Sequence, residues 1–429
     1  MPKTFLSNAR LLDPASGLDE VGDLIVEDGI ITGIGSSLGE PSDDAVYVDC
    51  AGLCLAPGLI DMRTRLGEPG EEQKETIDSL STSAARGGVT AVVGLPNTDP
   101  PIDDASVVEF VARRAREVKG VKIYVYGAAT RGFDGKRLTE VGLLKEAGAL
   151  AFTDGDKTIA GAQMMRRVLS YASGFDALVI QHPEEPSLMA EAVATEGEIA
   201  TRLGLPAGPA TAEAMMIERD VRLVELTGAR YHAAHISTAA AAAEIAQAKR
   251  KGLDVSCDTA PVYFALNDLE LLNYRTFARV SPPLRPEDER AAVVQAIKDG
   301  VIDVIASDHW GQDQEAKRLP FAQAEPGVVG VETLLPLSLE LYHKGEIGLL
   351  DLLAKLTVNP AKLLNLPGGV LSEGAPGDLV VFDLDRPWRI DVDALASKSK
   401  NSPFDGRPVQ GKVMATFVDG RMVFDGRDA

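Results

Sequence analysis

Cysteine, long apolar runs and basic charge are all scarce in this sequence of 429 residues. The three cysteines, Cys50, Cys54 and Cys257, form no CxxC pair and no even set, which argues against a disulfide framework and indicates reduced thiols in apolar surroundings. No apolar run approaches the roughly 18 residues of a membrane span, and the first residues lack the pattern of a signal peptide. We therefore expect a cytoplasmic protein that does not enter a membrane.

Acidic residues outnumber basic ones. The chain has 43 Lys and Arg against 64 Asp and Glu, so its formal net charge is −21. This charge repels nucleic-acid phosphates and anionic membrane surfaces, which removes nucleic acid and membranes from the expected partners. Hydrophobic residues make up 45% of the chain and charged residues 25%, which is the composition of an ordinary globular protein with a sizeable core.

Both ends of the chain contain short strands around an Asp-Gly pair. Asp28-Gly29 separates apolar segments near the N-terminus, and Asp419-Gly420 does so near the C-terminus. Such pairs between apolar runs are a strong hairpin signal. Neither set of strands is large enough for a core of its own. We therefore predict one small β-sandwich domain formed by both termini, residues 1–55 plus 365–429.

Between these ends, over residues 56–364, strand patterns alternate with helical ones. Helical spacing of apolar residues is clear over 75–86, and 239–250 is also helical in composition. Eight candidate strands lie at 58–62, 89–94, 121–127, 149–154, 177–182, 229–235, 253–258 and 302–307. Eight such units predict an α/β fold of the (β/α)8 TIM-barrel type in preference to an open doubly wound sheet.

Polar residues gather where these strands end, which is where a barrel of this type builds its active site. They are Arg63, Arg65, Asn97, Asp154, His182, His235, Asp308 and His309. A lone histidine at a strand end is more often a hydrogen-bonded core residue than a ligand. Several acidic and imidazole groups at one barrel mouth favour a functional site.

Asp154, His182 and His235 are candidate metal ligands. Two imidazoles and one carboxylate form a ligand set that leaves zinc an open position for water. His232 lies three residues before His235, so on one strand the two side chains face opposite sides and only one can point into the barrel. The sequence leaves open whether Asp154 or its neighbour Asp156 faces the site.

The run GLIDMRTRLGEPGEEQKETIDSLSTSAARGGVTAVVGLPNTDPPID occupies residues 58–103. Further stretches follow in order: AFTDGD (151–156), VIQHPEEP (179–186), EGEIATRLGLPAGPATAEAMMIERD (196–220), RYHAAHIST (230–238), SPPLRPEDER (281–290), DVIASDH (303–309) and SKSKNSPFDG (397–406). With these motifs the chain resembles the dihydroorotase family of cyclic amidohydrolases over nearly its whole length. The resemblance implies an amidohydrolase-type barrel with a small β-domain, and metal-dependent chemistry that interconverts dihydroorotate and carbamoyl aspartate.

The resemblance also implies roles for individual residues: a proton shuttle for Asp308, metal ligands for His182 and His235, and substrate binding for Asn97 and His309. The carboxylate after the fourth strand, Asp154 or Asp156, matches a further position of the site. A metal ion in such a site lowers the pKa of its bound water from about 15.7 to near 7.

The sequence departs from the family pattern at four places. Arg63-Thr64-Arg65 replaces a His-x-His pair after the first strand, and arginine has no lone pair for a metal. The other changes are Gly67 for the arginine that holds the substrate carboxylate, Ser281 for an asparagine, and Gln312 for the last histidine of an Asp-His-x-Pro-His motif. In this respect the chain resembles the non-catalytic dihydroorotase-like branch that has lost the His-x-His motif.

We interpret Arg63 and Arg65 as replacements for the metal. Their guanidiniums supply about +2 where a divalent ion would sit, and on this interpretation they neutralise Asp308 and Asp154 in a partly buried mouth. The alternative is that both arginines simply reach solvent at the rim.

Two hypotheses of function follow from the resemblance. In the first, the protein is catalytically impaired and acts in pyrimidine biosynthesis as a structural partner of aspartate carbamoyltransferase, in a homo-oligomer or hetero-oligomer. In the second, Asp154, His182 and His235 bind one Zn2+, and the chain is a single-metal dihydroorotase or a related cyclic amidohydrolase. The expected cofactor is therefore one zinc ion or none. Glycine at position 67 argues against dihydroorotate as a good substrate, because glycine does not replace a bidentate charge pair.

Overall fold

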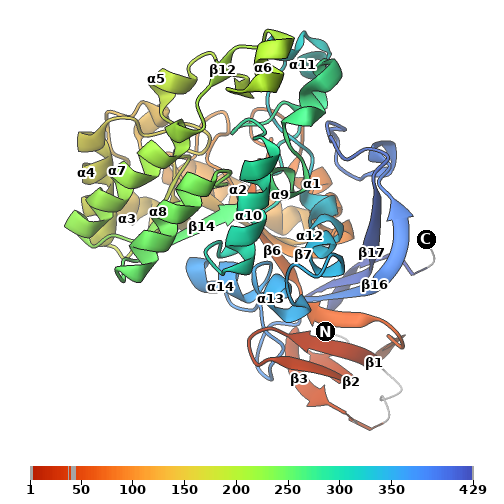
Figure 1. Ribbon diagram of the computed structural model, residues 1–429. Coiled ribbons are helices and arrows are strands. Elements are labelled where there is room, and N and C mark those ends of the chain that lie inside the picture. Colours follow the sequence, from red (N-terminus) through yellow and green to blue (C-terminus); the bar gives the residue numbers. More distant parts are fainter. Residues whose placement is uncertain (1–2, 37, 40–44, 428–429) are drawn as a thin grey trace.

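The computed structural model describes residues 3–36, 38–39 and 45–427. It contains a barrel wrapped by helices and a separate sheet that combines the two ends of the chain (Figure 1). The barrel and the joining of the two ends of the chain in one β-domain were predicted from the sequence, and the strands of this domain form a single sheet.

Eight parallel strands form the barrel. They are β6 (Leu59–Thr64), β7 (Val89–Gly94), β8 (Lys122–Gly127), β9 (Ala149–Phe152), β10 (Val179–Gln181), β13 (Tyr231–Ala233), β14 (Val255–Thr259) and β15 (Val304–Ile305). Neighbours in the sheet are also neighbours in this order along the chain. The two edges approach where Thr64 forms a parallel bridge with His309 and the Arg65 amide donates to the His309 carbonyl at 2.8 Å. The prediction of a (β/α)8 barrel is confirmed.

Helices cover the outside of the barrel (Figure 1). The longer ones are α1 (Ile77–Arg86), α2 (Ala105–Val118), α4 (Ala162–Ser173), α7 (Thr211–Thr227), α8 (Ala239–Arg250), α10 (Glu287–Lys298) and α12 (Leu334–His343). The shorter ones are α3 (Val141–Ala147), α5 (Pro186–Met189), α6 (Glu198–Leu203), α9 (Pro261–Ala265), α11 (Gln314–Arg318), α13 (Leu349–Ala354) and α14 (Val358–Leu364). Two short strands, β11 (Ala194–Thr195) and β12 (Ala207–Gly208), pair in the long connection between β10 and β13.

Helix α1 shows how the sequence directs these elements. Ile77, Leu80 and Ala84 recur at helical spacing and are buried in the barrel core. Thr76 caps the helix, and its side chain accepts a hydrogen bond from the Ser79 amide at 3.1 Å. The predicted start at residue 75 is two residues too early, because Glu75 precedes the cap and is a buried part of the barrel mouth.

The strands of both termini form one sheet. It contains β1 (Thr4–Asp13), β2 (Leu18–Glu27), β3 (Ile30–Gly35), β4 (Val46–Asp49), β5 (Cys54–Pro57), β16 (Leu379–Arg389), β17 (Pro408–Val418) and β18 (Arg421–Asp425). The strand order is β18-β17-β16-β5-β1-β2-β3, with β4 paired to β1. The two ends of the chain therefore join at the antiparallel pairing of β16 with β5. In Figure 1 these red and blue strands lie together beside the barrel.

Both predicted Asp-Gly turns are present and lie against each other. Asp28 and Gly29 have φ values of 50° and 84°, and Asp419 and Gly420 have 48° and 70°, which is the left-handed backbone that a two-residue hairpin turn requires. Gly377 links the turns, because its amide donates to the Gly29 carbonyl and its carbonyl accepts from the Gly420 amide, each at 2.8 Å. Each end of the chain thus fixes the position of the other.

Alternate side chains of β16 contribute to two different cores. Leu379 and Val381 pack with residues of β1, β2, β3, β5 and β17 in a core enclosed by the sheet itself. Val380 and Phe382 point the other way and join the core of the barrel, as the two-residue period of a strand requires. The domain boundaries at residues 1–55 plus 365–429 stay a prediction.

A segment between β16 and β17 contacts the loops of the barrel mouth. Ser397 Oγ donates to the Glu75 carboxylate, and Asn401 Nδ2 donates to the Trp310 carbonyl at 3.0 Å. The C-terminal part of the chain therefore helps to position loops that follow the first and last barrel strands.

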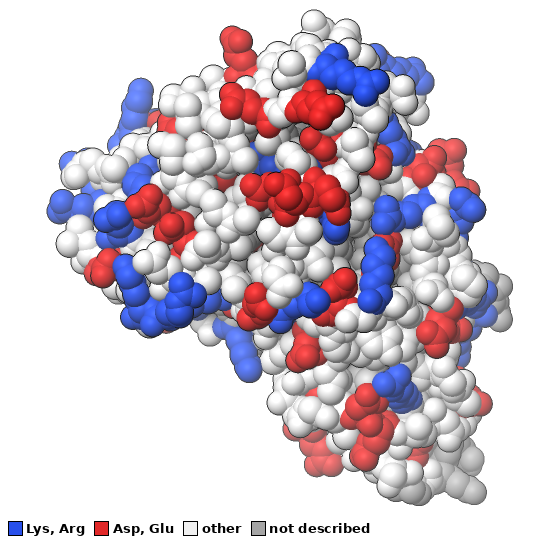
Figure 2. Space-filling view, in the orientation of Figure 1, with Lys and Arg blue, Asp and Glu red and all other residues white. Residues whose placement is uncertain are grey.

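Charge is mixed on the surface. On the face shown in Figure 2, acidic and basic side chains are interspersed, so the net charge of −21 does not gather into one acidic field there. Within the described ranges, no helix is both long and apolar enough to cross a membrane.

Candidate functional site at the barrel mouth

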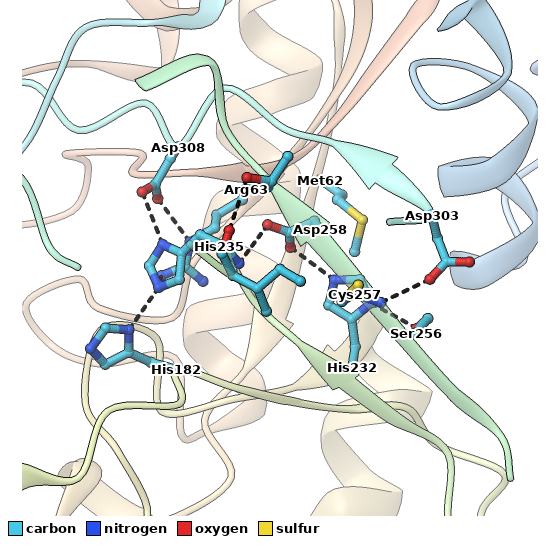
Figure 3. A network of polar contacts seen from close by, with 12 residues as sticks. Met62, Arg63, His182, His232, His235, Ser256, Cys257, Asp258, Asp303 and Asp308 are labelled. Atoms are coloured by element: carbon cyan, nitrogen blue, oxygen red, sulfur yellow. Dashed lines mark hydrogen bonds and ion pairs between the residues drawn. The ribbon is translucent and has the colours of Figure 1, made fainter. Parts of the chain in front are cut away.

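Four of the predicted site residues come together at the carboxyl ends of the barrel strands. Arg63 lies on β6, while His182 and His235 follow β10 and β13, and Asp308 follows β15. Figure 3 shows these four side chains converging. The barrel therefore unites residues from four separate β/α units in one polar cluster.

Arg63 is held between a carboxylate and an imidazole. Its Nε donates to Asp308 Oδ1 at 2.8 Å, and its Nη2 lies 3.5 Å from His235 Nε2. The Arg63 side chain is only 3% exposed, and that of Asp308 is 17% exposed. The alternative in which this arginine reaches solvent at the rim is therefore wrong for Arg63.

The two histidines extend this contact into a chain. His235 Nδ1 lies 3.0 Å from Asp308 Oδ2, and His235 Nε2 lies 2.6 Å from His182 Nδ1. His182 Nε2 is 3.1 Å from Glu184 Oε2. Three hydrogen bonds need three protons, whereas two neutral imidazoles carry two. The chain of contacts thus places Arg63 and two imidazoles between the carboxylates of Asp308 and Glu184.

Burial and neighbouring charges set the protonation of this chain. Burial raises the pKa of Asp308, but His235 and Arg63 outweigh that effect and hold the pKa well below its usual range. Burial and the Arg63 charge both lower the pKa of His235. Burial opposes ionisation of Glu184, yet its contact with His182 leaves the Glu184 pKa lowered. Both carboxylates are therefore ionised at neutral pH.

A second buried aspartate fixes the backbone of His235. Asp258 Oδ1 accepts from the His235 amide at 2.7 Å, and Asp258 Oδ2 lies 2.8 Å from His232 Nε2 (Figure 3). His232 also contacts Ser256 Oγ at 2.7 Å. His235 and Asp308 have φ values of 36° and 51°, which is uncommon for residues with side chains and requires support from the surroundings. His235 lies beyond the end of β13, so the expected opposition of the two side chains on one strand does not apply, and Asp258 contacts both residues.

Arg65 makes a second set of contacts at the mouth. Its Nη2 pairs with Asp156 Oδ2 at 2.8 Å, and its Nη1 donates to the Asn97 carbonyl at 3.1 Å. The guanidinium carbon lies 4.1 Å from the centre of the Trp310 ring, a cation–π arrangement. The structure thus gives Arg65 the carboxylate of Asp156 and not that of Asp154.

Asp154 has a different role from the one predicted. Its Oδ1 accepts from the amides of Ala129 and Thr130 at 3.1 and 2.8 Å, and its Oδ2 accepts from Thr130 Oγ1 at 2.5 Å. Burial raises the pKa of Asp154 to about 6, although these hydrogen bonds oppose the increase. Its carboxylate therefore organises the loop after β8 and does not join His182 and His235.

His309 is buried beside the mouth cluster. Its Nε2 lies 3.3 Å from Glu75 Oε2, and its Nδ1 accepts from the amides of Gly330 and Val331 at 3.3 and 3.4 Å. Both ring nitrogens are therefore engaged within the protein. Substrate binding by His309 stays a prediction, as it does for Asn97, whose Nδ2 donates to the Asp154 carbonyl.

Comparison with known proteins places this site in a family. The family described as Dihydro-orotase-like matches residues 52–241. A dihydroorotase of Syntrophus aciditrophicus is 43% identical over 98% of this chain and 99% of its own length, and one of Anaplasma phagocytophilum is 43% identical over 97% and 94%. The chain belongs to the dihydroorotase family. The solved structure of an L-hydantoinase from Arthrobacter aurescens superposes on this chain with a TM-score of 0.88 at 24% sequence identity. The superposition covers 99% of this chain and 97% of the hydantoinase, and it supports the barrel fold.

Proteins of the dihydroorotase family typically depend on a metal ion, so we tested whether this mouth fits one. His182 Nδ1 and His235 Nε2 do converge, but the Arg63 guanidinium lies 3.5 Å from the same His235 nitrogen. The Asp154 carboxylate is saturated by residues 129 and 130. Among the residues that the structure describes, no group of three or more His, Cys, Asp or Glu side chains is placed to hold a metal ion. The predicted set of Asp154, His182 and His235 therefore does not fit a three-ligand zinc site.

Two residues of this dihydroorotase-family site were not predicted from the sequence. One is Glu184, which is buried beside His182 and lies 3.7 Å from Arg285. The other is Glu75, which is buried against His309. The signal for Glu184 was its place two residues after a strand-end histidine. Nothing near Glu75 in the sequence distinguishes it from the half-buried Glu71 and the exposed Glu72.

Proposed function

We propose that this member of the dihydroorotase family acts in pyrimidine biosynthesis as a catalytically impaired, structural partner of aspartate carbamoyltransferase. The observation that supports impairment is the position of Arg63, which pairs with Asp308 and lies beside His235 Nε2. Opening a ring amide with water at neutral pH requires a group that makes hydroxide from water. A metal ion does this, whereas a guanidinium has no lone pair and cannot act as a base.

The residues of the mouth therefore have a structural task in this proposal. Arg63 gives the buried carboxylate of Asp308 a cationic partner, and His235 and His182 connect this pair to Glu184. Asp308 is the proton shuttle of the family pattern, but here both of its oxygens are engaged by Arg63 and His235. An aspartate held in this way is poorly placed to move a proton to substrate.

The proposed partner rests on the resemblance to the non-catalytic branch of the family. The same proposal includes an oligomer of this chain with itself or with aspartate carbamoyltransferase, located in the cytoplasm.

A second candidate function is a working dihydroorotase or related cyclic amidohydrolase with one zinc ion. The names of the relatives favour this candidate over the first, because proteins 40–43% identical over nearly the full length are named dihydroorotase. The facing nitrogens of His182 and His235 would be its remaining metal ligands. Arg63 would have to move away from His235 to admit the ion.

Metal content and ring opening separate the two candidates. The chain is purified without chelators or metal-affinity resin, and metal per chain is measured by mass spectrometry beside ring opening of dihydroorotate. We expect metal close to zero and a rate equal to that of Asp308→Asn. About one zinc per chain that is lost in His235→Ala, together with turnover, would establish the second candidate.

The partner is tested by size-exclusion chromatography of this chain mixed with the aspartate carbamoyltransferase of the same organism. We expect the two to elute together at a mass above that of either alone. Separate elution of both proteins at micromolar concentrations would contradict the structural role.

A further inference from the structure

A groove lies at the end of the barrel opposite the mouth, where strands β8 and β9 begin. It has a volume of about 750 Å3 and is bordered by the last turns of α2, the end of α3 and the turn that joins β17 to β18. The first three residues of β8 are only half-buried, whereas the neighbouring strand β7 is buried along its whole length. The start of β8 therefore remains open to solvent.

Aliphatic side chains form the floor of the groove. They come from α2, β8 and β9 and include Val111, Val121, Ile123, Val125 and Leu150. Ile123 and Leu150 pack against the barrel cores and are nevertheless only half-buried. Removing their remaining surface from water is favourable, so the floor suits an apolar ligand.

The rim of the groove is basic. Five charged side chains line the groove, and four of them are basic: Arg116, Lys119, Lys122 and Arg421. The acidic one, Asp419, is paired with Lys122 Nζ at 2.7 Å, so its charge is already balanced. This local excess of positive charge contrasts with the net charge of −21 of the whole chain.

Arg116 and Lys119 keep their charges available to a ligand. Both residues are exposed, and within the described ranges neither side chain makes an ion pair or a hydrogen bond. Arg421 Nη2 donates to the carbonyls of Lys119 and Gly120 at 2.5 and 3.4 Å. These contacts hold a third cation at the rim and do not neutralise it.

We propose that this groove binds a free alkyl carboxylate of medium chain length, with the alkyl chain on the aliphatic floor and the carboxylate at Arg116 and Lys119. Concave and mostly apolar sites with a few charged groups are typical of small-molecule binding, and their volumes are about 300–1,000 Å3. A carboxylate is the charge complement of the two cations. A membrane lipid fits less well, because the net charge of −21 opposes approach to an anionic membrane surface.

This inference goes beyond the proposed function and does not depend on it. The groove is formed where the barrel strands begin, and none of the residues of the mouth cluster lines it. Metal content and ring opening therefore have no bearing on its outcome.

Isothermal titration calorimetry of the whole chain tests the proposal, with each probe kept below the concentration at which it forms micelles. Decanoate is the expected ligand, decyltrimethylammonium has a chain of equal length with the opposite charge, and hexanoate has the same charge on a shorter chain. We expect saturable binding of decanoate. The other two probes should each bind at least tenfold more weakly, because like charges repel and fewer methylenes are buried.

Each probe can contradict one part of the proposal. Equal binding of decyltrimethylammonium would overturn the role of the basic rim. Equal binding of hexanoate would overturn the role of the aliphatic floor. No saturable binding of decanoate would overturn the proposal as a whole.

Substitutions locate the site. Replacing both free cations, by Arg116→Gln and Lys119→Gln in one chain, should weaken decanoate binding about tenfold. Ala115→Phe adds a ring on the groove side of α2 and should abolish binding without a change of charge. If this variant has a lower melting temperature than the wild type, the charge variant decides.

Arg250→Gln is the matched control. Arg250 is an exposed arginine in the last turn of α8 and does not line the groove. A cation in the last turn of a helix also suits the helix dipole, and this control removes such a cation elsewhere. We expect it to leave decanoate binding unchanged.

Two further results would overturn the proposal. Decanoate binding that neither the charge variant nor Ala115→Phe affects would place the amphiphile elsewhere on the molecule. Sedimentation that shows an oligomer of the wild type and its loss in Ala115→Phe would mean that a second copy of the chain covers the groove.

Discussion

Two buried networks of arginine and carboxylate lie close together in this barrel, and they differ in how completely their atoms are paired. In the first, Glu213 accepts hydrogen bonds from Ser237, Thr238 and Arg285. Arg285 also donates to Ser237 and Thr195. Neither Glu213 nor Arg285 has a buried atom without a partner.

The second network, at the mouth, is incomplete. Arg63 and Arg65 each keep one unpartnered nitrogen although both side chains are almost fully buried. A fully paired network stabilises one structure, whereas a partly paired one loses stability unless something else binds. The comparison separates a network whose polar atoms are all paired from one that leaves several buried polar atoms unpaired.

The largest expected effect comes from breaking the complete network. Glu213→Ala leaves Arg285 as an unpaired buried charge, and we expect a loss of about 4 kcal/mol in the free energy of unfolding. Urea denaturation followed by circular dichroism measures it. Glu225→Ala is the control, because Glu225 is 56% exposed and lies 3.8 Å from Lys251. A loss as small as that of the control would contradict the structural role of this network.

Arg63→Ala should have the next largest effect. It leaves Asp308 buried beside a histidine, and we expect a loss of about 3 kcal/mol in the free energy of unfolding. Arg65→Ala should lower the free energy of unfolding by less, because its partner Asp156 is more exposed than Asp308. Unchanged melting temperatures in both variants would count against the idea that the arginines hold the carboxylates of the mouth.

Asp154 gives a pH-dependent test. Its pKa is raised from 3.8 to about 6, so its contribution to stability is present below pH 4 and is lost as the pH rises through 6. Asp154→Asn removes this titration and keeps an acceptor for the two amides. Between pH 4 and pH 8 we expect the free energy of unfolding of the wild type to fall by about 2 kcal/mol relative to that of the variant, as measured by urea denaturation at each pH. Asp176→Asn, at a side chain 80% exposed, should show no such difference.

The smallest effect is expected from Asp156→Asn. The Asp156 side chain is 28% exposed, and its ion pair with Arg65 is partly screened by solvent. We expect at most about 1 kcal/mol of lost stability, as is usual for accessible ion pairs. A loss of stability as large as that of Arg63→Ala would contradict the expectation that the Arg65–Asp156 ion pair is weaker than the Arg63–Asp308 ion pair.

Some features could be predicted because they depend on residues close together in the chain. The period of apolar residues defines each strand of the barrel, and the Asp28-Gly29 and Asp419-Gly420 turns follow from backbone preferences alone. The Arg63-Thr64-Arg65 segment is also visible in the sequence, and arginine has no lone pair for a metal.

Other features were decided only by the tertiary structure. Asp154 and Asp156 are two residues apart, yet one binds the backbone at Thr130 and the other pairs with Arg65. Glu184 is buried beside His182, and a loop residue of this kind is exposed in most proteins.

The physical reason lies in the range of the interactions. Strands and turns are governed by backbone sterics and by side-chain periodicity within a few residues, so the sequence by itself determined the barrel and the paired ends of the chain. The protonation and pairing of Arg63 depend on Asp308, which is 245 residues away in the chain. Only the closed barrel brings these charges within hydrogen-bond distance, and burial there makes their pairing strong.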